Sequence, residues 1–508
     1  MSKKTLILTC FIILKFLLQY FLINPEYDLQ RDEYLYLDQG NHLAWGYASV
    51  PPFISWISRF ILFFGHAEFW VRFIPALFGA LTIVAVWKGI EELKGNLFSL
   101  ILGATCMLFS CFLRLNQLYQ PNSPDALCWT AFCLVVIKYF HTEKPKWLYI
   151  GAILFAIGFL NKYNILFLLM GFFPAVLLSK HRQIYIKRDF LFSALLGLVL
   201  IVPNLIWQYE NHFPAIHHMK ELAERQLVHV NRWTFVKDQV FYFIGSFLVI
   251  LSSLYALLFY PPFKMYRCFF WTMIFTLTIF IYLRAKSYYT IGLYPIYISF
   301  GSVFLGDMLK TGWKRYLQPV FISIPVLFYI ILFNVVFSLK SPEYIIAHSK
   351  AYKKLGLLRW EDGKDHVLPQ DFSDMLGWKE LAYKVDTIYS HLPKNEHTLV
   401  LCDNYGQAGA INYYGNHLDK AAVSFNADYI NWFNLEKRYD NLIRIKSYEN
   451  KENELTTSSP FFDSAREGGS ITNPFAREYG TTIFVFRKAN IDIRPRIQNE
   501  IDKTRDER

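Results

Sequence analysis

The amino-acid sequence predicts a polytopic α-helical membrane protein that ends in a soluble α/β domain. The chain of 508 residues is 54% hydrophobic and only 18% charged, which is less charge than a soluble protein of this length usually carries. Its apolar residues form long blocks before about residue 340 and are ordinary in number after it. We therefore expect a membrane module over residues 1–340 and a soluble domain over residues 341–508.

The apolar blocks predict about eleven membrane spans, because a helix needs roughly 20 apolar residues to cross the bilayer. Nine blocks are candidates for single spans: residues 5–23, 71–90, 97–115, 124–140, 190–208, 240–260, 268–283, 288–306 and 317–338. The block 147–179 would form a helix about 50 Å long, which is too long for a core of about 30 Å. Asn161-Lys162 lies at its middle, so we divide it there into two short spans.

The charged loops support this count and give an orientation. With Lys3 and Lys4 in the cytoplasm, the positive-inside rule holds through nearly every turn. The basic residues of the cytoplasmic turns are Lys88, Lys94, Lys144, Lys146, Lys180, Arg182, Lys187, Arg188, Lys264, Arg267, Lys310, Lys314 and Arg315. The outer face then receives the loops 24–70 and 209–238 and everything after Lys340. A single span over 147–179 would instead place the later basic loops outside.

Four elements are predicted beyond residue 340. Residues 377–392 carry apolar side chains at helical spacing, and residues 405–414 could form a second helix. Residues 398–402 and 482–486 are typical of short strands. These elements predict a small mixed α/β domain. The last stretch, from about Asn490, is charged and shows no periodicity that we recognise, so we expect a frayed tail.

Composition and motifs exclude several functions. The net charge of +11 could indicate a nucleic-acid binder, but the basic residues lie between apolar blocks, where they anchor spans, so nucleic acid is not expected. The seven cysteines form no CxxC pair, which argues against disulfides, zinc and thiol chemistry. The chain contains no GxxxxGK[ST], GxGxxG or GxSxG, so ATPase, dinucleotide-binding and α/β-hydrolase functions have no support.

Acidic side chains at the outer ends of spans are candidates for catalysis. Asp32 and Glu33 follow the first span, and a carboxylate at the bilayer surface can take a proton from an acceptor hydroxyl during substitution. The alternative is that the pair only caps a surface helix. Asp125, at the outer end of a later span, can reach the same surface. It also fits a helical first turn, where the dipole favours an acid.

Basic and aromatic side chains gather on the same face: Arg72, Lys162, Arg284, Lys286, Tyr163, Tyr288 and Tyr289. Interfacial cations often only snorkel, but the positive-inside bias predicts few of them on the outer side. Lys162 lies in a tight turn between two apolar helices. A prenyl phosphate in the outer leaflet would place its charge at this depth. Lysine and arginine could hold it there and stabilise it as a leaving group.

A metal site is conceivable in the loop 209–238, which contains four histidines: His212, His217, His218 and His229. Their spacing fits no ligand motif, and surface histidines are the simpler explanation. We therefore predict no metal ligands and no cofactor, with a divalent metal left open.

Several short stretches occur together, in order, through most of the chain. They are Arg31-Asp-Glu-Tyr34, Gly46-Tyr, Pro51-Pro52, Val71-Arg72-Phe-Ile-Pro75, Ser123-Pro-Asp125-Ala-Leu, Leu160-Asn-Lys162-Tyr163, Pro203-Asn-Leu-Ile-Trp207, Asn211-His-Phe-Pro214, Ala285-Lys286-Ser-Tyr-Tyr289, Leu293-Tyr-Pro295, Asn404-Tyr-Gly-Gln-Ala408 and Tyr413-Tyr-Gly415. In this set the chain resembles the bacterial branch of the dolichyl-phosphate-mannose protein mannosyltransferases (glycosyltransferase family 39). That family lies in the GT-C superfamily, together with the aminoarabinose transferases that act on lipid A.

The resemblance implies a GT-C fold and an inverting glycosyltransferase with a polyprenyl-phosphate sugar donor. It implies a base at Asp32 with Glu33 as its partner, a second acid at Asp125, and basic residues at the donor phosphate. It places the reaction on the periplasmic face of a bacterial inner membrane, without a required metal. The acceptor could be protein, lipid A or a glycan, and the C-terminal domain looks family-like only around residues 405–415.

Two functions from other classes stay open. One is a secondary transporter or lipid flippase, although transporters place ionisable residues near the bilayer midplane and here they gather at one surface. The other is a noncatalytic scaffold protein of the envelope, for which no positive feature is present.

Overall fold

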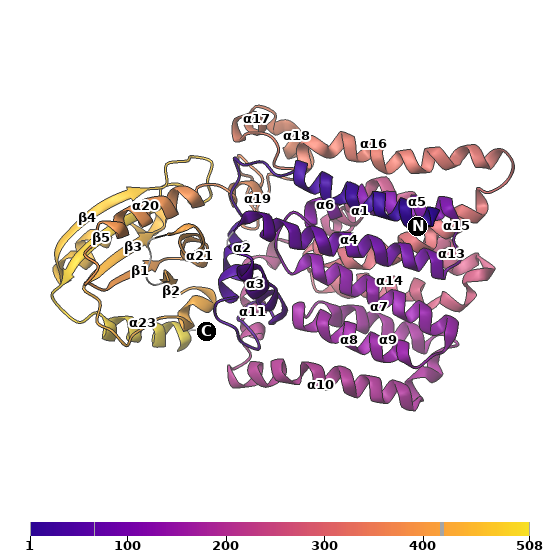
Figure 1. The fold of residues 1–508 in the computed structure, drawn as a ribbon, viewed down its shortest axis with the longest axis horizontal. Coiled ribbons are helices and arrows are strands. Elements are labelled where there is room, and N and C mark those ends of the chain that lie inside the picture. The colour runs from indigo at the N-terminus through magenta and orange to yellow at the C-terminus, as the bar shows by residue number, and fades with distance from the viewer. Residues whose placement is uncertain (1, 66, 417–420, 507–508) are drawn as a thin grey trace.

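The apolar blocks of the first 340 residues fold into helices that lie side by side in one bundle, in the computed structural model of the protein (Figure 1). The structure describes residues 2–65, 67–416 and 421–506. The apolar bundle helices are α1 (Lys3–Phe21), α4 (Glu68–Glu92), α5 (Leu97–Leu108), α7 (Asn122–Thr142), α8 (Lys146–Asn161), α9 (Ile165–Leu177), α10 (Arg188–Glu210), α13 (Phe247–Phe259), α14 (Cys268–Tyr282), α15 (Tyr294–Met308) and α16 (Gln318–Val336). Each predicted span therefore coincides with a helix.

Not every one of these helices is long enough to span a bilayer alone. Six segments of the described chain have the required length and composition, and the pair α12 (Arg232–Tyr242) and Ile244–Phe259, bent by 69°, would make a seventh. The others are shorter, such as α5 with 12 residues and α14 with 15. A polytopic helical fold is thus present, and the number eleven stays a prediction.

The predicted break at Asn161-Lys162 is confirmed. Helix α8 ends at Asn161, Lys162 is extended with a φ of −159°, and α9 starts at Ile165. The two helices have 16 and 13 residues. This turn places the Lys162 side chain, which is half-buried, at the end of the bundle that faces the α/β unit.

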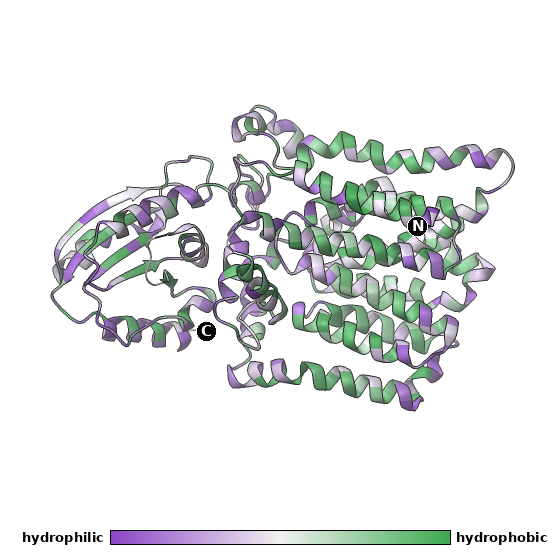
Figure 2. Ribbon diagram, in the orientation of Figure 1, coloured by the Kyte–Doolittle hydropathy of each residue, from purple (hydrophilic) through white to green (hydrophobic). Residues whose placement is uncertain are grey.

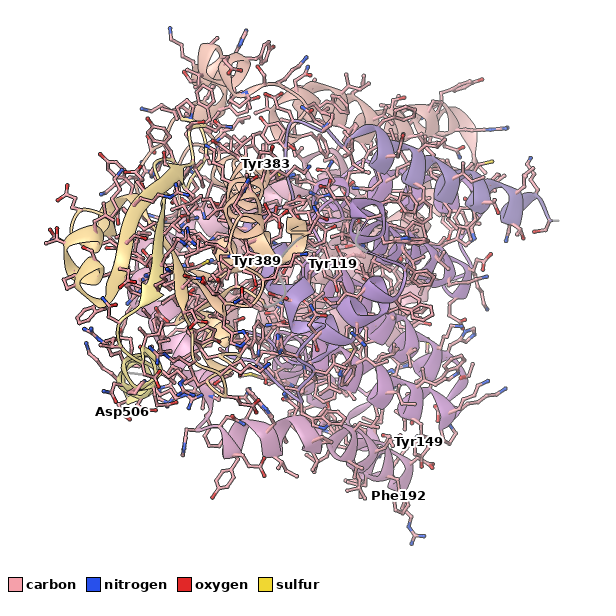
Figure 3. All side chains as sticks on the ribbon, turned by 60° about the vertical axis from the view of Figure 1, so that its left-hand side comes forward. Tyr119, Tyr149, Phe192, Tyr383, Tyr389 and Asp506 are labelled. Atoms are coloured by element: carbon pink, nitrogen blue, oxygen red, sulfur yellow. The ribbon has the colours of Figure 1, made fainter. Side chains whose placement is uncertain are left out.

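The loops sort onto two ends of the bundle. The α7–α8, α9–α10 and α15–α16 turns and the N-terminus lie at the end farthest from the α/β unit (Figure 1). Hydrophobic residues dominate the helices between the two ends (Figure 2). Phe192 of α10 is 59% exposed and points away from the bundle (Figure 3), as expected for a side chain that faces lipid.

Short helices cover the end of the bundle next to the α/β unit. They are α2 (Arg31–Gln39), α3 (Phe53–Phe63), α6 (Phe112–Leu115), α11 (Pro214–Arg225), α17 (Pro342–Ala347), α18 (Ser349–Lys354) and α19 (Gln370–Ser373). Helix α2 begins with a capping box, in which the side chain of Gln30 accepts from Asp32 N–H and Glu33 accepts from Gln30 N–H. This box satisfies two backbone donors and fixes where α2 starts.

The C-terminal part is a five-stranded mixed sheet with helices on both faces. Its strands are β1 (Thr398–Cys402), β2 (Val423–Ser424), β3 (Asn441–Lys446), β4 (Phe462–Ser470) and β5 (Thr482–Ala489), in the order β2-β1-β3-β5-β4. β1 pairs in parallel with β2 and β3, and β5 pairs antiparallel with β3 and β4. The helices are α20 (Trp378–Ser390), α21 (Tyr405–Tyr414), α22 (Glu454–Ser458) and α23 (Arg494–Asp506).

The C-terminal tail corrects one prediction. Instead of fraying from about Asn490, the chain forms α23, and Ile497 and Ile501 are buried with Ile493 against the sheet. Alternate strand residues such as Leu399 and Leu401 face this helix, while Val400 and Cys402 face α20 and α21. The isoleucines stand four apart, which is helical spacing within a charged segment.

The predicted boundary near residue 340 does not separate two hydrophobic cores. Residues of the first outer loop (Leu29, Tyr34), of the segment after α16 (Leu368, Phe372) and of the α/β unit share one hydrophobic core. The ring of Tyr34 packs edge-on against that of Trp378, with centroids 5.7 Å apart. The first loop and the α/β unit therefore form one continuous body, and a cavity lies where they meet the bundle.

Candidate active site

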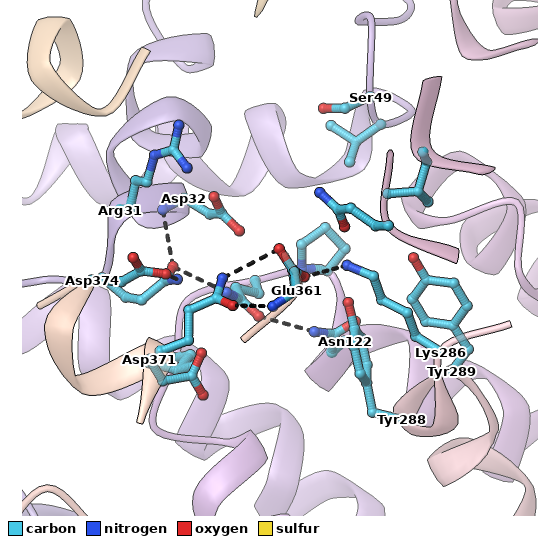
Figure 4. Close-up of a pocket in the computed structure, with 18 of the residues that line it drawn as sticks. Arg31, Asp32, Ser49, Asn122, Lys286, Tyr288, Tyr289, Glu361, Asp371 and Asp374 are labelled. Carbon is cyan, nitrogen blue, oxygen red and sulfur yellow. Dashed lines mark hydrogen bonds and ion pairs between the residues drawn. The ribbon is translucent and has the colours of Figure 1, made fainter. Parts of the chain in front are cut away.

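A cavity of about 1850 Å³ lies between the α/β unit and the end of the bundle next to it. Its lining comes from α2, from the turns at Asn122, Lys162 and Lys286, from α11, and from the segment after α16. In Figure 4, Arg31, Asp32 and Asp374 lie on one side of this pocket, and Lys286, Tyr288 and Tyr289 lie on the other. The sequence-predicted acid Asp32 thus faces two of the predicted tyrosines and a predicted cation across a shared space.

Asp32 is held by the α/β unit. It occupies the first turn of α2, and its Oδ1 accepts a 2.6 Å hydrogen bond from the hydroxyl of Tyr405. Helix α21 can approach α2 this closely because of Gly406 and Gly409. A Cβ on Gly406 would come within 2.8 Å of Arg31 Cγ, and one on Gly409 within 2.7 Å of Tyr34 Cβ, so larger residues would push the helices apart.

Arg31 lies beside the carboxylate. Its guanidinium stacks over the Tyr405 ring, 4.4 Å from the centroid, and the negative charges of Asp32 and Asp374 act on it. Among the described residues, the buried Nε of Arg31 has no hydrogen-bond partner. This guanidinium places positive charge next to Asp32.

Lys162 and Lys286 form the cationic side of the cavity together with two tyrosines. The Lys162 ammonium donates to Asn122 Oδ1 at 2.8 Å and lies 4.2 Å from the centroid of the Tyr289 ring. It also lies 5.4 Å from the centroid of Tyr288. All four side chains line the cavity. Two ammonium groups on one side of the cavity make a site where an anion can bind.

Glu361 is the partner of Lys286. The two form a short ion pair, and Gln370 donates to the other oxygen of Glu361 at 3.2 Å. Burial lowers the pKa of Lys286, but the Glu361 carboxylate, Tyr289 and Asp32 together raise it, so the pKa lies above its ordinary value. For Glu361, burial raises the pKa and the Lys286 ammonium lowers it, with a net decrease. Both groups are therefore charged at neutral pH.

Glu33 does not join Asp32 in the cavity, contrary to expectation. It is fully buried, accepts from Arg72 at 2.9 and 3.1 Å, and accepts from the Tyr119 N–H at 2.6 Å. Neighbouring positions on a helix differ by about 100°, so Asp32 and Glu33 cannot both face the same space. Burial raises the pKa of Glu33, and the Arg72 guanidinium and two backbone N–H groups oppose this rise.

Arg72, which was predicted to help hold the phosphate, does not line the cavity either, because it pairs with the buried Glu33. Its guanidinium donates to Glu33, to the Gln117 carbonyl at 2.7 Å and to the Asp28 carbonyl at 3.3 Å. These contacts direct both terminal nitrogens of the guanidinium into the protein. Arg72 and Glu33 together fix α2 against α4, and neither lines the cavity.

Three other predicted residues lie outside the described lining of the cavity. Asp125 is buried behind Lys162 and accepts from Trp129 Nε1 and Asn164 Nδ2, both at 3.0 Å. Its charge still acts on Lys162. Tyr163 donates to Asn204 at 3.0 Å, and Arg284 is exposed, with a φ of +51°, next to residues 228–233.

Sequence reasoning missed four residues of this site: Glu361, Asp374, Tyr405 and Arg477. Asp374 accepts from Arg477 at 3.0 Å and, through Oδ2, from Gln30 at 3.4 Å. Tyr405 belonged to a stretch that carried the family resemblance, Asn404-Tyr-Gly-Gln-Ala408, which was a usable signal. The other three come from segments without a recognisable pattern.

The histidine-rich loop lies over the cavity as α11. His217 and His218 line it. Burial lowers the pKa of His218 and Lys286 lowers it further, whereas Glu221 and Asp32 raise it. Within the described residues, no group of three or more His, Cys, Asp or Glu side chains is arranged to hold a metal ion.

Comparison with known proteins supports the resemblance drawn from the motifs. Residues 49–207 match the model of the dolichyl-phosphate-mannose-protein mannosyltransferase family. The chain is related to this family. The match covers the end of the first outer loop, Arg72, Asp125 and Lys162, and three of the quoted stretches centre on those residues.

Two solved structures share the fold of this chain. ArnT from Cupriavidus metallidurans in the apo state superposes with a TM-score of 0.65, at 13% identity, over 97% of this chain and 99% of that one. ArnT bound to undecaprenyl phosphate gives 0.62, also at 13% identity, over 95% and 98%. The fold of ArnT is therefore present through nearly the whole chain.

A curated relative is the lipid A galacturonosyltransferase RgtD of Rhizobium johnstonii. It is 22% identical over 241 residues, which are 46% of this chain and 49% of RgtD. The alignment thus spans about half the length of this relative.

Proposed function

We propose that this chain is a membrane glycosyltransferase that moves a sugar from a polyprenyl-phosphate donor to an acceptor hydroxyl. The observation that carries the proposal is the shared cavity, in which Asp32 lies opposite Lys286 (Figure 4) and which Lys162 also lines. A transfer from a sugar phosphate needs a base for the acceptor on one side and positive charge for the phosphate on the other. The cavity supplies both.

Asp32 acts as the base. Its carboxylate takes the proton of the acceptor hydroxyl while the acceptor oxygen bonds to the anomeric carbon of the sugar. The bond from that carbon to the phosphate oxygen breaks, and its electron pair leaves with the phosphate. A single displacement of this kind inverts the configuration at the anomeric carbon. Tyr405 orients the carboxylate through its hydrogen bond.

Lys162 and Lys286 hold the departing phosphate. Charge-assisted hydrogen bonds from ammonium groups stabilise an oxyanion more as its charge grows. Tyr288 and Tyr289 flank Lys162, and Tyr289 also acts on Lys286. Asp125 supports Lys162 electrostatically from behind the cavity wall. Phosphate is a good leaving group, so the proposed step needs no general acid and no metal.

An apolar wall of the same cavity suits the prenyl chain. It consists of Phe109, Phe241, Phe243, Phe328, Tyr329, Leu332, Val335, Val336 and Phe337. Part of it belongs to the outer half of α16, which would lie within the bilayer. ArnT, which has this fold, was crystallised with undecaprenyl phosphate. We propose a donor of this class, with its phosphate at Lys162 and Lys286 and its tail on this wall.

The proposed location is the inner membrane of a bacterium, with the N-terminus in the cytoplasm and the cavity and α/β unit on the periplasmic face. The basic turns predicted to be cytoplasmic join bundle helices, and the α/β unit lies at the opposite end from the N-terminus. The acceptor is a periplasmic protein, lipid A or glycan.

The test is a matched set of variants of the full chain in proteoliposomes without any ion gradient. Undecaprenyl phosphate carrying a labelled sugar is offered together with an envelope extract. Wild-type protein should consume the donor, which a secondary transporter would not do. Asp32→Asn should lower turnover by at least about 100-fold with normal insertion and thermal stability.

The control is Arg284→Ala, because this exposed arginine lies outside the described cavity lining. It should keep wild-type turnover, while Lys162→Ala should raise the donor KM about tenfold or more by deleting a charge-assisted contact. Near-normal turnover in Asp32→Asn would remove Asp32 from the mechanism. Equal effects of Lys162→Ala and Arg284→Ala would reduce Lys162 to an anchor.

A further inference from the structure

A row of three carboxamide side chains crosses the cavity between its cationic and its acidic side. The Lys162 ammonium donates to Asn122 Oδ1 at 2.8 Å, and Asn122 Nδ2 donates to Gln120 Oε1 at 3.0 Å. Gln120 Nε2 then donates to Gln30 Oε1 at 3.2 Å. All three carboxamides line the cavity. We refer to Gln30, Gln120 and Asn122 as the carboxamide row.

The two ends of the row fix the direction of every hydrogen bond in it. An ammonium group can only donate, so Asn122 must present its oxygen to Lys162 and its NH₂ to Gln120. At the other end, Gln30 Oε1 also accepts from the Asp32 N–H at 2.9 Å, and Gln30 Nε2 donates to the Asp374 carboxylate at 3.4 Å. A carboxylate can only accept. The amide dipoles are therefore aligned from cation to anion, which strengthens each bond.

The row leaves hydrogen-bonding capacity free. Among the contacts of the described residues, the NH₂ groups of Asn122 and Gln120 each use one of two protons within the row, and their oxygens each use one of two lone pairs. Asn122 and Gln120 are only half-buried. A ligand in the cavity can therefore bind uncharged hydrogen-bond donors and acceptors, of fixed direction, along the carboxamide row.

The position of the row identifies what lies over it if the proposed function holds. The donor phosphate is at Lys162, where the row begins, and the base is at Asp32, where it ends. The transferred sugar joins these two points, because its anomeric carbon carries the phosphate and is attacked by the hydroxyl that Asp32 activates. The sugar therefore rests on Asn122, Gln120 and Gln30.

We infer that the carboxamide row is the recognition surface for the transferred sugar and that it selects a neutral, hydroxylated hexose or pentose. A hydroxyl both donates and accepts, so it matches a carboxamide on each count. Over the middle of the row, a uronate carboxylate or a sugar ammonium would lie on neutral dipoles and lose part of its hydration, because the charged groups Lys162 and Asp374 lie only at the two ends of the row. This inference rests on the proposed function and names its donor class.

The experiment measures kcat/KM for a panel of undecaprenyl-phosphate sugars with the full chain in proteoliposomes. The panel contains glucose, mannose, xylose, galacturonic acid and 4-amino-4-deoxyarabinose. Wild-type protein should use at least one neutral sugar about tenfold better than either charged one. Gln120→Met, which keeps the side-chain length and removes both hydrogen-bonding atoms, should lower kcat/KM for that neutral donor by about 3- to 10-fold.

Two further measurements separate recognition from mere support of the fold. The Kd of Gln120→Met for undecaprenyl phosphate without a sugar should stay within about twofold of wild type, because Asn122 still holds Lys162. Removal of one hydroxyl from the preferred sugar should lower the kcat/KM of wild type for at least one monodeoxy analogue. With Gln120→Met, the same analogue should have the same kcat/KM as the parent sugar, because the hydrogen bond is already absent. Asn211→Ala, an exposed carboxamide at the cavity edge outside the row, is the matched control and should change neither value.

Three results would overturn the inference. A preference of wild type for the uronate or amino donor would show that the transferred sugar is charged. If Gln120→Met weakened the binding of undecaprenyl phosphate as much as it lowered kcat/KM for the sugar donor, the row would only position Lys162. In both cases the proposed transferase function stands. Consumption of none of the donors overturns that function, and this inference with it.

Discussion

The hydroxyl of Tyr405 donates a 2.6 Å hydrogen bond to Oδ1 of Asp32, so a residue of the α/β unit holds the candidate base in the first outer loop. The two residues are 373 positions apart in the sequence. The contact depends on the close packing of α21 on α2 at Gly406 and Gly409. The α/β unit is thus part of the site and not only an appendage to the bundle.

Removal of this hydroxyl should slow transfer without weakening donor binding. Tyr405→Phe keeps the ring that stacks on Arg31 and deletes only the bond to Asp32, which is worth about 1 kcal/mol and slightly more for a charged acceptor. We expect kcat to fall about 5- to 10-fold with an unchanged donor KM. Tyr383→Phe on α20, whose side chain is 74% exposed, is the matched control. An unaltered kcat in Tyr405→Phe would mean that the hydroxyl does not orient the base.

The pair Glu33 and Arg72 should matter for stability rather than for chemistry. Arg72→Ala leaves the fully buried Glu33 carboxylate without its counter-charge, and breaking a buried ion pair on one side costs about 3–5 kcal/mol. We expect a clear fall in the thermal unfolding midpoint. Arg284→Ala serves as the exposed arginine control and should shift it little. Wild-type stability of Arg72→Ala would show that water or relaxation satisfies Glu33.

The fold was largely predictable because a bilayer restricts the sequence strongly. A span needs a long apolar block with charges at its ends, so each helix of the bundle was recognisable in the sequence as such a block. The turn at Lys162 was found because one apolar block was too long for one crossing. The helix α23 was missed because Ile493, Ile497 and Ile501 are sparse among charged residues, although their spacing is helical.

The site was predictable only for residues near span ends. Asp32, Lys162, Lys286, Tyr288 and Tyr289 share an outer face that the spans define, and the structure gathers them. The positions of the span ends do not predict which side of a helix faces the cavity. Asp32 and Glu33 are adjacent, yet only Asp32 lines the cavity. Glu361 and Asp374 were not found because tertiary packing, and no local pattern, brings their segment to α2.

Protonation of Asp374 should make stability depend on pH. Burial raises the pKa of this carboxyl to about 6, although Arg477 and Arg31 lower it and Asp32 raises it. Since the folded pKa lies above the ordinary value of 3.8, the folded protein binds a proton between about pH 6 and pH 4 that the unfolded chain lacks. This group therefore adds stability as the pH falls through about 6, by up to about 3 kcal/mol.

Asp374→Asn separates this contribution from other titrating groups. The unfolding midpoint of wild type minus that of the variant should rise as the pH is lowered from 7 to 4.5 and should be constant above pH 7. The variant is measured under identical detergent and salt conditions. A difference that does not vary with pH would indicate that Asp374 stays ionised throughout, held by Arg477.

Glu361 should compete with the donor phosphate for Lys286. The Glu361 carboxylate pairs with the Lys286 ammonium inside the cavity, where the phosphate is proposed to bind, and two anions at one cation repel each other. Glu361→Gln removes the negative charge and keeps an oxygen that can accept from Lys286. We therefore expect undecaprenyl phosphate to bind about 5- to 10-fold more tightly, which is of the order of one charge-assisted contact.

Titration of the full chain with undecaprenyl phosphate at two salt concentrations measures this gain in affinity, and the gain should shrink at high salt. Asp371→Asn is the charge-matched control, because Asp371 lines the cavity but pairs with Arg114. If Glu361→Gln instead weakens binding, the carboxylate must hold Lys286 in its working position, and the phosphate must then share Lys286 with Glu361 rather than displace it.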